Sequence, residues 1–222
     1  IILGVIMPVM LLILFSSIQA NIQIEIFTAQ MLTPGMIVFS FTFLFMFAAF
    51  LLAKDRQNSF LVRLFVSPLK PVDFILSYFL PFIPIAVFQI IICMTVGYFF
   101  GAQFENIVIL FFVLLLTSTI CISLGMIIGS LLTVNQVSGI GSFLITVIAL
   151  FSGAMMDLKM VGGIFETIGY ATPFAHAVDA SRDLMKGESF AEIIVHFWWI
   201  AGYAILFFAA AVIAFKTKTR IK

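Results

Sequence analysis

The sequence predicts an all-α membrane protein. We expect six transmembrane helices, a cytoplasmic amphipathic helix after the second and a re-entrant helical hairpin on the outer side before the last. Of the 222 residues, 64% are hydrophobic, whereas a soluble domain is roughly 45–50% apolar. Only 9% are charged, and the charges gather in short segments between long apolar runs. The net charge of +1 gives no reason to expect a nucleic-acid partner.

Charged and polar residues divide the chain into spans of about 20 residues, the length that a helix needs to cross a bilayer. No charge lies between Glu105 and Asp157, a run too long for one span, and its polar break at 133–141 divides it into two. The predicted spans are 1–18, 35–53, 74–100, 107–132, 137–155 and 193–215, all within a single domain, 1–222. Because the chain opens on an apolar run without an initiator methionine, we expect upstream sequence to be missing.

Prolines and tryptophans mark particular points along these spans. Pro34 and Gly35 are expected to open the second span. Pro81 and Pro84 interrupt the third, where we expect either a kink or a separate interfacial first turn. The pair Trp198–Trp199 near the start of the sixth span suits the headgroup region of a membrane.

The distribution of Lys and Arg sets the expected orientation. Four lie in the segment 54–73 and four in the C-terminal tail. Six spans put both segments on the same side, and the excess of positive charge makes that side cytoplasmic. We therefore expect a multi-pass protein of the plasma membrane, in a bacterial or archaeal inner membrane, with both termini in the cytoplasm.

The segment 54–73 predicts a short amphipathic helix on the membrane surface. Its residues recur at helical spacing, and Pro68 ends the pattern. The polar stripe comprises Arg56, Ser59, Arg63 and Ser67, and the apolar stripe comprises Leu61, Leu64 and Phe65. Two interpretations stay open: a solvated loop that only fixes topology, or a docking surface for a cytoplasmic partner.

The segment 157–192 predicts helices on the outer side. Thr172 can cap a helix that begins at Pro173, and Gly187 is placed to end it. The expected apolar face comprises Phe174, Ala177, Val178, Ser181 and Met185, while His176, Asp179, Arg182, Asp183 and Lys186 occupy the rest. The spacing predicts the ion pairs Asp179–Arg182 and Asp183–Lys186. The preceding apolar run 161–171 is too short to span, so we expect it to dip into the outer leaflet and return.

Few residues offer catalytic chemistry. His176, Asp179 and Asp183 share one helix and are a candidate metal site, but the expected ion pairs use the same carboxylates, so we expect no metal. The sequence lacks G-x-x-x-x-G-K-[ST], the phosphate-binding loop of many ATPases. The predicted spans also lack the charged residue that an ion-coupled transporter usually keeps.

Two regions resemble the type-2 family of ATP-binding-cassette (ABC) transporter permeases. The family's first cytoplasmic loop has a pattern like E-R-E-x-G-T-x-E-x-L-x-x-S-P. Here it reads Asp55-Arg56-Gln57, then Ser59 in place of the usual glycine, then Arg63 to Pro68, with Gln57 and Val62 replacing glutamates. The run FSG at 151–153 is similar to the family's small-Gly motif, and TPFAHAVDA at 172–180 with Arg182 to its P-x-x-x-x-V-D-A-x-R segment. Asp157 stands where a proline is common.

The resemblance implies the permease subunit of an exporter, which moves an amphipathic substrate such as a drug, an antibiotic or a lipid out of the cell. A separate cytoplasmic ATPase subunit would bind ATP and Mg²⁺, so the chain itself would be neither an enzyme nor a cofactor protein. A second permease copy in a homodimer, or a paralogue, would complete the complex. The residues implied in coupling to the ATPase are Arg56, Ser59, Phe60, Arg63, Phe65, Ser67 and Pro68. Those implied at the outer hairpin and exit are Ser152, Gly153, Pro173, His176, Asp179 and Arg182.

Three other functions stay open. One is a polysaccharide or glycolipid exporter of the same family. Another is a stand-alone channel or secondary transporter, which transport by this chain alone in vesicles under an ion gradient would reveal. The third is a membrane-embedded enzyme that uses His176 and the nearby carboxylates.

Overall fold

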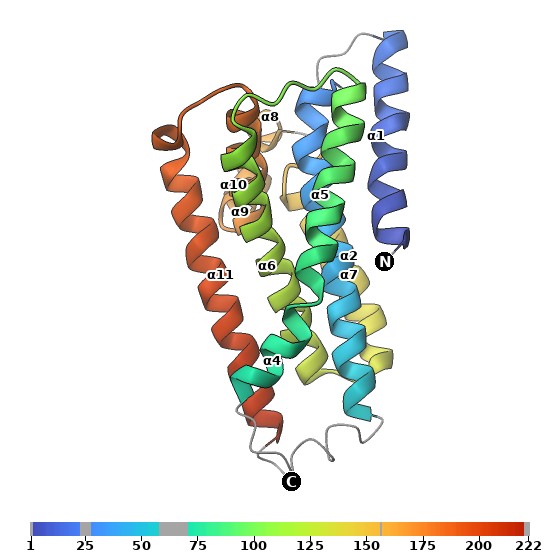
Figure 1. Cartoon of the computed structure of the whole chain (residues 1–222), viewed down its shortest axis with the longest axis vertical. Helices are drawn as coiled ribbons and strands as arrows, with labels where there is room; N and C mark the ends of the chain where they lie inside the picture. The colour runs from blue at the N-terminus through green and yellow to red at the C-terminus, as the bar shows by residue number, and fades with distance from the viewer. Residues whose placement is uncertain (1, 23–27, 58–70, 156, 220–222) are drawn as a thin grey trace.

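The computed structural model describes residues 2–22, 28–57, 71–155 and 157–219, and its long helices lie side by side in one bundle (Figure 1). No strand occurs in these ranges, so the all-α prediction is confirmed. The helices are α1 (Ile2–Ile22), α2 (Ala29–Gln57), α4 (Pro71–Phe79), α5 (Phe82–Phe99), α6 (Ile107–Leu131), α7 (Val134–Phe151), α8 (Leu158–Val161), α9 (Gly163–Tyr170), α10 (Pro173–Met185) and α11 (Phe190–Thr219).

Five helical segments of the described chain are long and apolar enough to cross a membrane. They are Ala29–Gln57, Pro71–Phe99, Ile107–Leu131, Val134–Phe151 and Phe190–Thr217. In α1 the apolar segment Ile6–Gln19 is shorter. The prediction of six spans therefore stays a prediction for the first of them.

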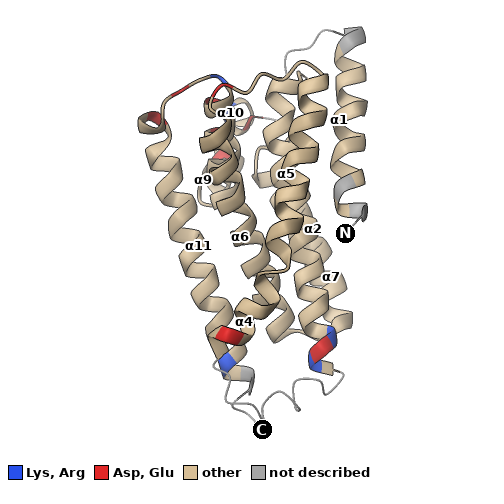
Figure 2. Ribbon diagram, viewed as in Figure 1, with Lys and Arg blue, Asp and Glu red and all other residues tan. Residues whose placement is uncertain are grey.

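The described charges lie at the two ends of the bundle, and the ribbon between them is free of charge (Figure 2). One end holds Lys54, Asp55 and Arg56 in the last turns of α2 and Asp73 in the first turn of α4. The other end holds the charges of α8 to α10. Since a charge in hydrocarbon is costly, this distribution is what a bundle that spans a membrane requires.

Two helices begin earlier than the sequence predicted. α2 begins at Ala29, so that Pro34 lies inside the helix instead of opening it; a proline early in a helix costs one backbone hydrogen bond. α7 begins at Val134 because the Gln136 side-chain oxygen accepts a hydrogen bond of 3.0 Å from the backbone N–H of Thr133. The side chains of Thr133 and Gln136 each pair with the backbone of the other residue, and this capping box is a common helix start.

The predicted interruption of the third span is confirmed. α4 and α5 are separated by a turn at Leu80 and Pro81, and α4 runs at an angle to α5 (Figure 1). Pro84 lies in the first turn of α5, where its missing N–H would have no partner within the helix in any case.

α2 is the central helix of the bundle and is in close contact with α6. Gly125 and Gly129 of α6 face it: a Cβ atom at Gly125 would lie 2.3 Å from the carbonyl oxygen of Phe45, and one at Gly129 would lie 2.6 Å from that of Ala49. Membrane helices associate by such small-residue contacts, because lipid supplies no hydrophobic force between them. Glycine is therefore required at both positions by the distance between the helices.

Candidate functional site

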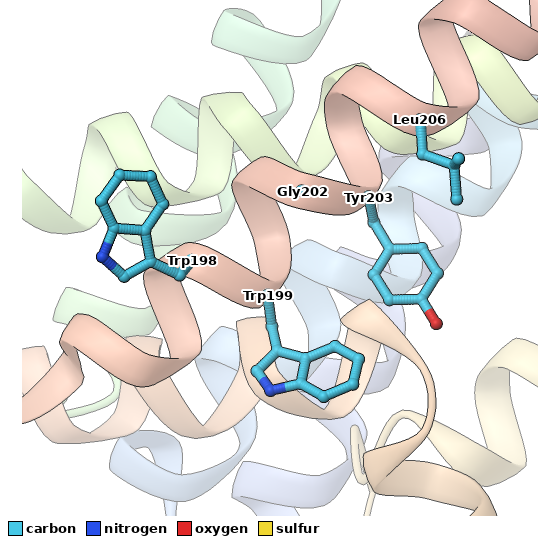
Figure 3. Close-up of a pocket in the computed structure, with 5 residues that line it drawn as sticks. All are labelled: Trp198, Trp199, Gly202, Tyr203 and Leu206. Atoms are coloured by element: carbon cyan, nitrogen blue, oxygen red, sulfur yellow. The ribbon is translucent and has the colours of Figure 1, made fainter.

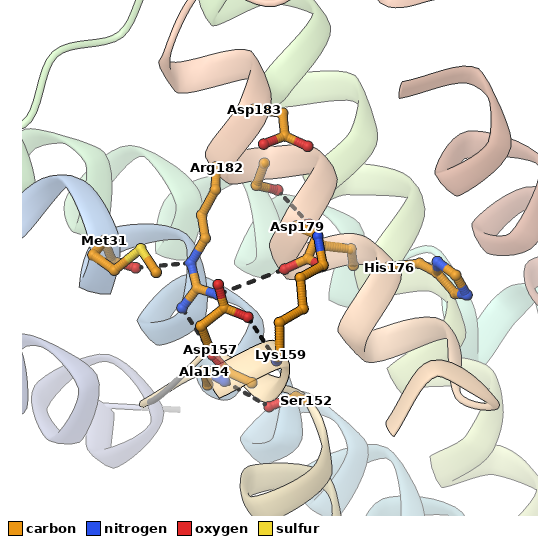
Figure 4. Close-up of polar contacts among 12 residues, drawn as sticks. Met31, Ser152, Ala154, Asp157, Lys159, His176, Asp179, Arg182 and Asp183 are labelled. Carbon is orange, nitrogen blue, oxygen red and sulfur yellow. Dashed lines mark hydrogen bonds and ion pairs between the residues drawn. The ribbon is translucent and has the colours of Figure 1, made fainter. Parts of the chain in front are cut away.

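A buried arginine joins three segments at the end of the bundle that carries α8 to α10 (Figure 4). The side chain of Arg182 on α10 is 4% exposed. Its Nη2 donates a hydrogen bond of 2.8 Å to the carbonyl oxygen of Gly153, and its Nε donates one of 3.2 Å to that of Met31. Its Nη1 lies 3.6 Å from Oδ1 of Asp179. Arg182 thus holds together the start of α2, the turn after α7, and α10.

The turn that accepts this bond is tightly packed against α2. Gly153 has a φ of +70°, a left-handed conformation that favours glycine. Ser152 is buried, and its Oγ accepts a hydrogen bond of 3.2 Å from the N–H of Ala154. A Cβ atom at Gly35 of α2 would lie 2.1 Å from the carbonyl oxygen of Ala154. The two backbones are therefore in direct contact.

Besides Arg182, a hydrogen-bond donor and a second cation lie next to the carboxylate of Asp179. The hydroxyl of Tyr170 donates a hydrogen bond to its Oδ2, and Nζ of Lys159 lies 3.9 Å from the same oxygen. Burial, and then the hydrogen bond to Asp179, raise the pKa of Tyr170. Burial lowers the pKa of Arg182, and the charge of Asp179 opposes this effect. The carboxylate is therefore well compensated, which suits a structural role.

His176 points away from this ion pair (Figure 4) and toward α11. Its Nδ1 lies 2.7 Å from Nδ1 of His196, and its Nε2 lies 3.1 Å from the carbonyl oxygen of Tyr170. Its ring stacks on Trp199, with ring centroids 5.0 Å apart and planes at 14°. Burial, followed by the charge of His196, lowers the pKa of His176.

Two apolar hollows lie near His176 and Trp199. A groove of about 450 Å³ follows one face of α11 and is lined by Trp198, Trp199, Gly202, Tyr203 and Leu206 (Figure 3). A cavity of about 200 Å³ lies under the turn between α9 and α10, against side chains of α6, α7 and α11. Tyr203 lines both, and its hydroxyl donates a hydrogen bond of 2.8 Å to the carbonyl oxygen of Ala171.

At the opposite end of the bundle, the last turns of α2 are bound to two other helices. Nη1 of Arg56 donates a hydrogen bond of 3.0 Å to the carbonyl oxygen of Gly129, near the C-terminus of α6. The hydroxyl of Tyr78 on α4 donates one of 2.7 Å to Oδ2 of Asp55. A cation is favourable at a helix C-terminus, where the last carbonyl groups lack partners within the helix. The helices on both sides of segment 58–70 are therefore connected to each other and to α6.

The model of the family described as "ABC-2 type transporter" matches residues 1–186 of this chain. The chain belongs to the ABC-2 type transporter family. It is thus the integral membrane component of an ABC transporter, and permeases of this family generally work with an ABC ATPase partner. Neither the comparison with curated proteins nor that with solved structures gave a match.

In this ABC-2 type permease, four of the residues predicted for the outer segment lie together, and His176 points away from them. Ser152, Gly153, Asp179 and Arg182 meet in the ion-pair cluster, and Pro173 is the first residue of α10. Both predicted ion pairs are present, with Asp183 and Lys186 3.9 Å apart. Gly187, with a φ of +94°, follows the end of α10 as predicted. Whether α8 and α9 re-enter the membrane stays a prediction.

Two expectations for α10 were wrong in detail. His176 and Arg182 were placed outside the apolar face, yet they are as buried as that face, at 7% and 4% exposed, because neighbouring segments cover them. Thr172 precedes α10, yet its hydroxyl donates a hydrogen bond of 2.8 Å to the carbonyl oxygen of Gly169 instead of capping α10. Among the described residues, no three His, Cys, Asp or Glu side chains are grouped as a metal site requires.

Most of the residues predicted to couple to the ATPase lie outside the described residues. They are Ser59, Phe60, Arg63, Phe65, Ser67 and Pro68. Arg56 is described, and it binds α6 of its own chain. The amphipathic coupling helix therefore stays a prediction.

Sequence reasoning missed the partners that come from distant segments. Met31, Lys159, Tyr170 and His196 contact the predicted residues, yet no spacing in the sequence relates them. The close contact of α6 with α2 could have been predicted from the sequence, because Gly125 and Gly129 form a G-x-x-x-G motif in an apolar helix.

Proposed function

We propose that this ABC-2 type permease exports an amphipathic substrate, such as a drug or a lipid, with energy from ATP hydrolysed by a separate cytoplasmic ATPase subunit. A second copy of the permease would face α7 and complete the path. The observation that carries the proposal is a polar stripe along the exposed side of α7. The resemblance of the sequence motifs to those of exporter permeases supports the outward direction.

The stripe consists of Asn135, Ser138, Ser142 and Thr146, all of them exposed. They recur at intervals of three or four and so share one side of the helix. The opposite side, with Val137, Gly141 and Ile148, is buried against the bundle. A hydroxyl group that faces lipid hydrocarbon finds no further hydrogen-bond partner there. A hydroxyl group that faces a partner helix or a water-filled path does find one.

Apolar side chains lie directly beside the stripe. Phe143 and Leu150 are exposed on the same helix, next to Thr146 by helical spacing. The hydroxyl groups of Ser142 and Thr146 donate to the carbonyl groups four residues before them, at 2.8 and 3.0 Å, and their oxygens can still accept a hydrogen bond. A path with polar and apolar strips side by side suits a substrate that has both kinds of surface.

Replacing Ser142 and Thr146 together with leucine is expected to reduce export about fivefold or more, because the path would lose two acceptors worth roughly 0.5–1.5 kcal/mol each. Binding of the ATPase should be retained. The measurement is uptake of a fluorescent amphipathic probe into inverted vesicles that contain the permease and its ATPase. Phe143→Leu, an apolar change on the same exposed side, is the matched control.

Unchanged probe export in the double variant would contradict the proposed path. Export of an undecorated polysaccharide by the same complex, with no export of amphipathic probes, would instead support the carbohydrate alternative. Transport by the permease without an ATPase under an ion gradient would exclude ATP-driven export as the sole mechanism.

The contacts at the other end of α2 give a second test of the proposal. Tyr78→Phe removes the hydrogen bond to Asp55, and Arg56→Ala removes the bond to Gly129. If a displacement of the C-terminal end of α2 by the ATPase passes to α6 through these bonds, the double variant should hydrolyse ATP at the normal rate but export less, by roughly three- to tenfold. Thr95→Val, which removes a hydroxyl bonded only within α5, is the control. An unchanged ratio of export to hydrolysis would contradict this role.

A further inference from the structure

Two histidines that lie far apart in the sequence meet between α10 and α11. Nε2 of His176 faces the carbonyl oxygen of Tyr170 at 3.1 Å. A carbonyl oxygen only accepts, so this nitrogen carries the hydrogen, and Nδ1 of a neutral His176 is an acceptor. The Nδ1 of His196, at 2.7 Å, must then be the donor. The contact thus requires one hydrogen, and no more, between the two Nδ1 atoms.

We propose that His176 and His196 form a proton-binding site that holds α10 against α11 at neutral pH and releases this contact in acid. A first proton can bind Nε2 of His196, which leaves the hydrogen bond intact and makes it charge-assisted. A second proton has to bind Nδ1 of His176. Two N–H groups and two positive rings then face each other, and the contact must open.

The surroundings of His176 prevent its ring from moving aside alone. The ring lies between Trp199, which stacks on it, and Tyr170, whose ring centroid is 5.5 Å away. Trp199 in turn stacks on Tyr203, at 5.9 Å and 18°, and Tyr203 is bonded to Ala171 ahead of α10. Separation of the two histidines therefore separates α11 from the outer segment.

The charges near the pair come from four helices. They are Asp179, Arg182 and Asp183 on α10, Tyr170 on α9, Lys159 on α8 and His196 on α11. Asp179 favours a charged His176, but Arg182 and Lys159 already balance that carboxylate. Burial and the neighbouring His196 have the larger effect, and they lower the pKa of His176.

The direction of the pH effect follows from this lowered pKa. A histidine in an unfolded or opened chain takes up its proton near pH 6.5. His176 in the closed contact resists that proton until the pH is lower. The closed contact is therefore fully favoured above about pH 6.5 and is progressively lost as the pH falls through the pKa of the buried His176.

The two tryptophans of the chain, Trp198 and Trp199, give a direct readout. In the Trp198→Phe variant, purified as the full chain in lipid nanodiscs, emission reports on Trp199. Acidification from about pH 7.5 to about pH 4.5 is expected to change its intensity and shift it to longer wavelength, as Trp199 loses its stacked partner. With His196→Gln the wavelength shift should be largely lost, because the amide can turn its oxygen toward a protonated Nδ1 of His176 and no second positive ring opposes it.

Two further measurements decide the outcome. The pH-dependent change in Trp199 emission should vanish with His176→Gln. The Trp199→Phe variant keeps only the exposed Trp198, and its emission should not change with pH. Amide hydrogen exchange along α10, corrected for its intrinsic pH dependence, should rise in acid in the parent chain and stay constant with His176→Gln. Quenching without a wavelength shift and without faster exchange would overturn the proposal, as would a response that persists in His176→Gln.

Discussion

Replacing Arg182 with methionine is expected to cost about 3–5 kcal/mol of stability, the usual penalty when one partner of a buried ion pair is removed. Asp179 would lose its nearest cation, and the carbonyl groups of Gly153 and Met31 would lose their donor. Because these groups belong to three segments, α10, α2 and the turn after α7 should separate together. The measurement is thermal unfolding of the purified permease, followed by size-exclusion chromatography.

Two other variants separate the charge of Arg182 from its hydrogen bonds. Arg182→Lys keeps the charge but cannot reach two carbonyl groups and a carboxylate at once, so it should recover only part of the stability. Arg182→Met combined with Asp179→Asn removes both charges and should be less unstable than Arg182→Met alone. Lys186→Met, at a more exposed ion pair just after the last residue of α10, should change stability by less than about 1 kcal/mol. Equal stability of Arg182→Met and Lys186→Met would contradict the central role of Arg182.

Replacing Gly125 with leucine is expected to prevent normal packing of the bundle. A Cβ atom there would lie 2.3 Å from a backbone oxygen of α2, which cannot move aside as a flexible side chain can. Forced separation of these two helices should cost roughly 3 kcal/mol or more, above the ordinary range for overpacking, since α2 and α6 form the centre of the structure. We expect loss of the folded monodisperse protein in detergent.

Glycines elsewhere in the bundle provide matched controls for this change. Gly139 on α7 and Gly202 on α11 have no heavy atom within 4 Å of an added Cβ. Leucine at either position should leave the yield and the melting temperature nearly unchanged. Gly125→Ala should fall between these variants and Gly125→Leu. Normal folding of Gly125→Leu would mean that α2 and α6 are not in direct backbone contact.

The sequence alone was sufficient to predict the helical architecture and most helix positions. Apolar runs and the charges between them are local properties, and a bilayer accepts few structures other than helices. α6, at Ile107–Leu131, lies where its run predicted, and Pro81 interrupts the third span as expected. The start of α10 followed from Pro173, because this residue acts on its own backbone. The family resemblance also rested on short motifs that are visible in the sequence.

The tertiary structure alone decided which residues act together. Arg182 and Lys186 are equivalent by spacing, since each stands three residues after an aspartate, yet one is buried in a three-segment junction and the other is exposed. His176 and His196 meet only because α10 and α11 pack against each other. Burial and pairing depend on segments that arrive from elsewhere in the chain, and helical periodicity carries information about one helix only. The sequence therefore predicted where helices lie, and packing determined which side chains became an ion-pair junction, a helix contact or a proton site.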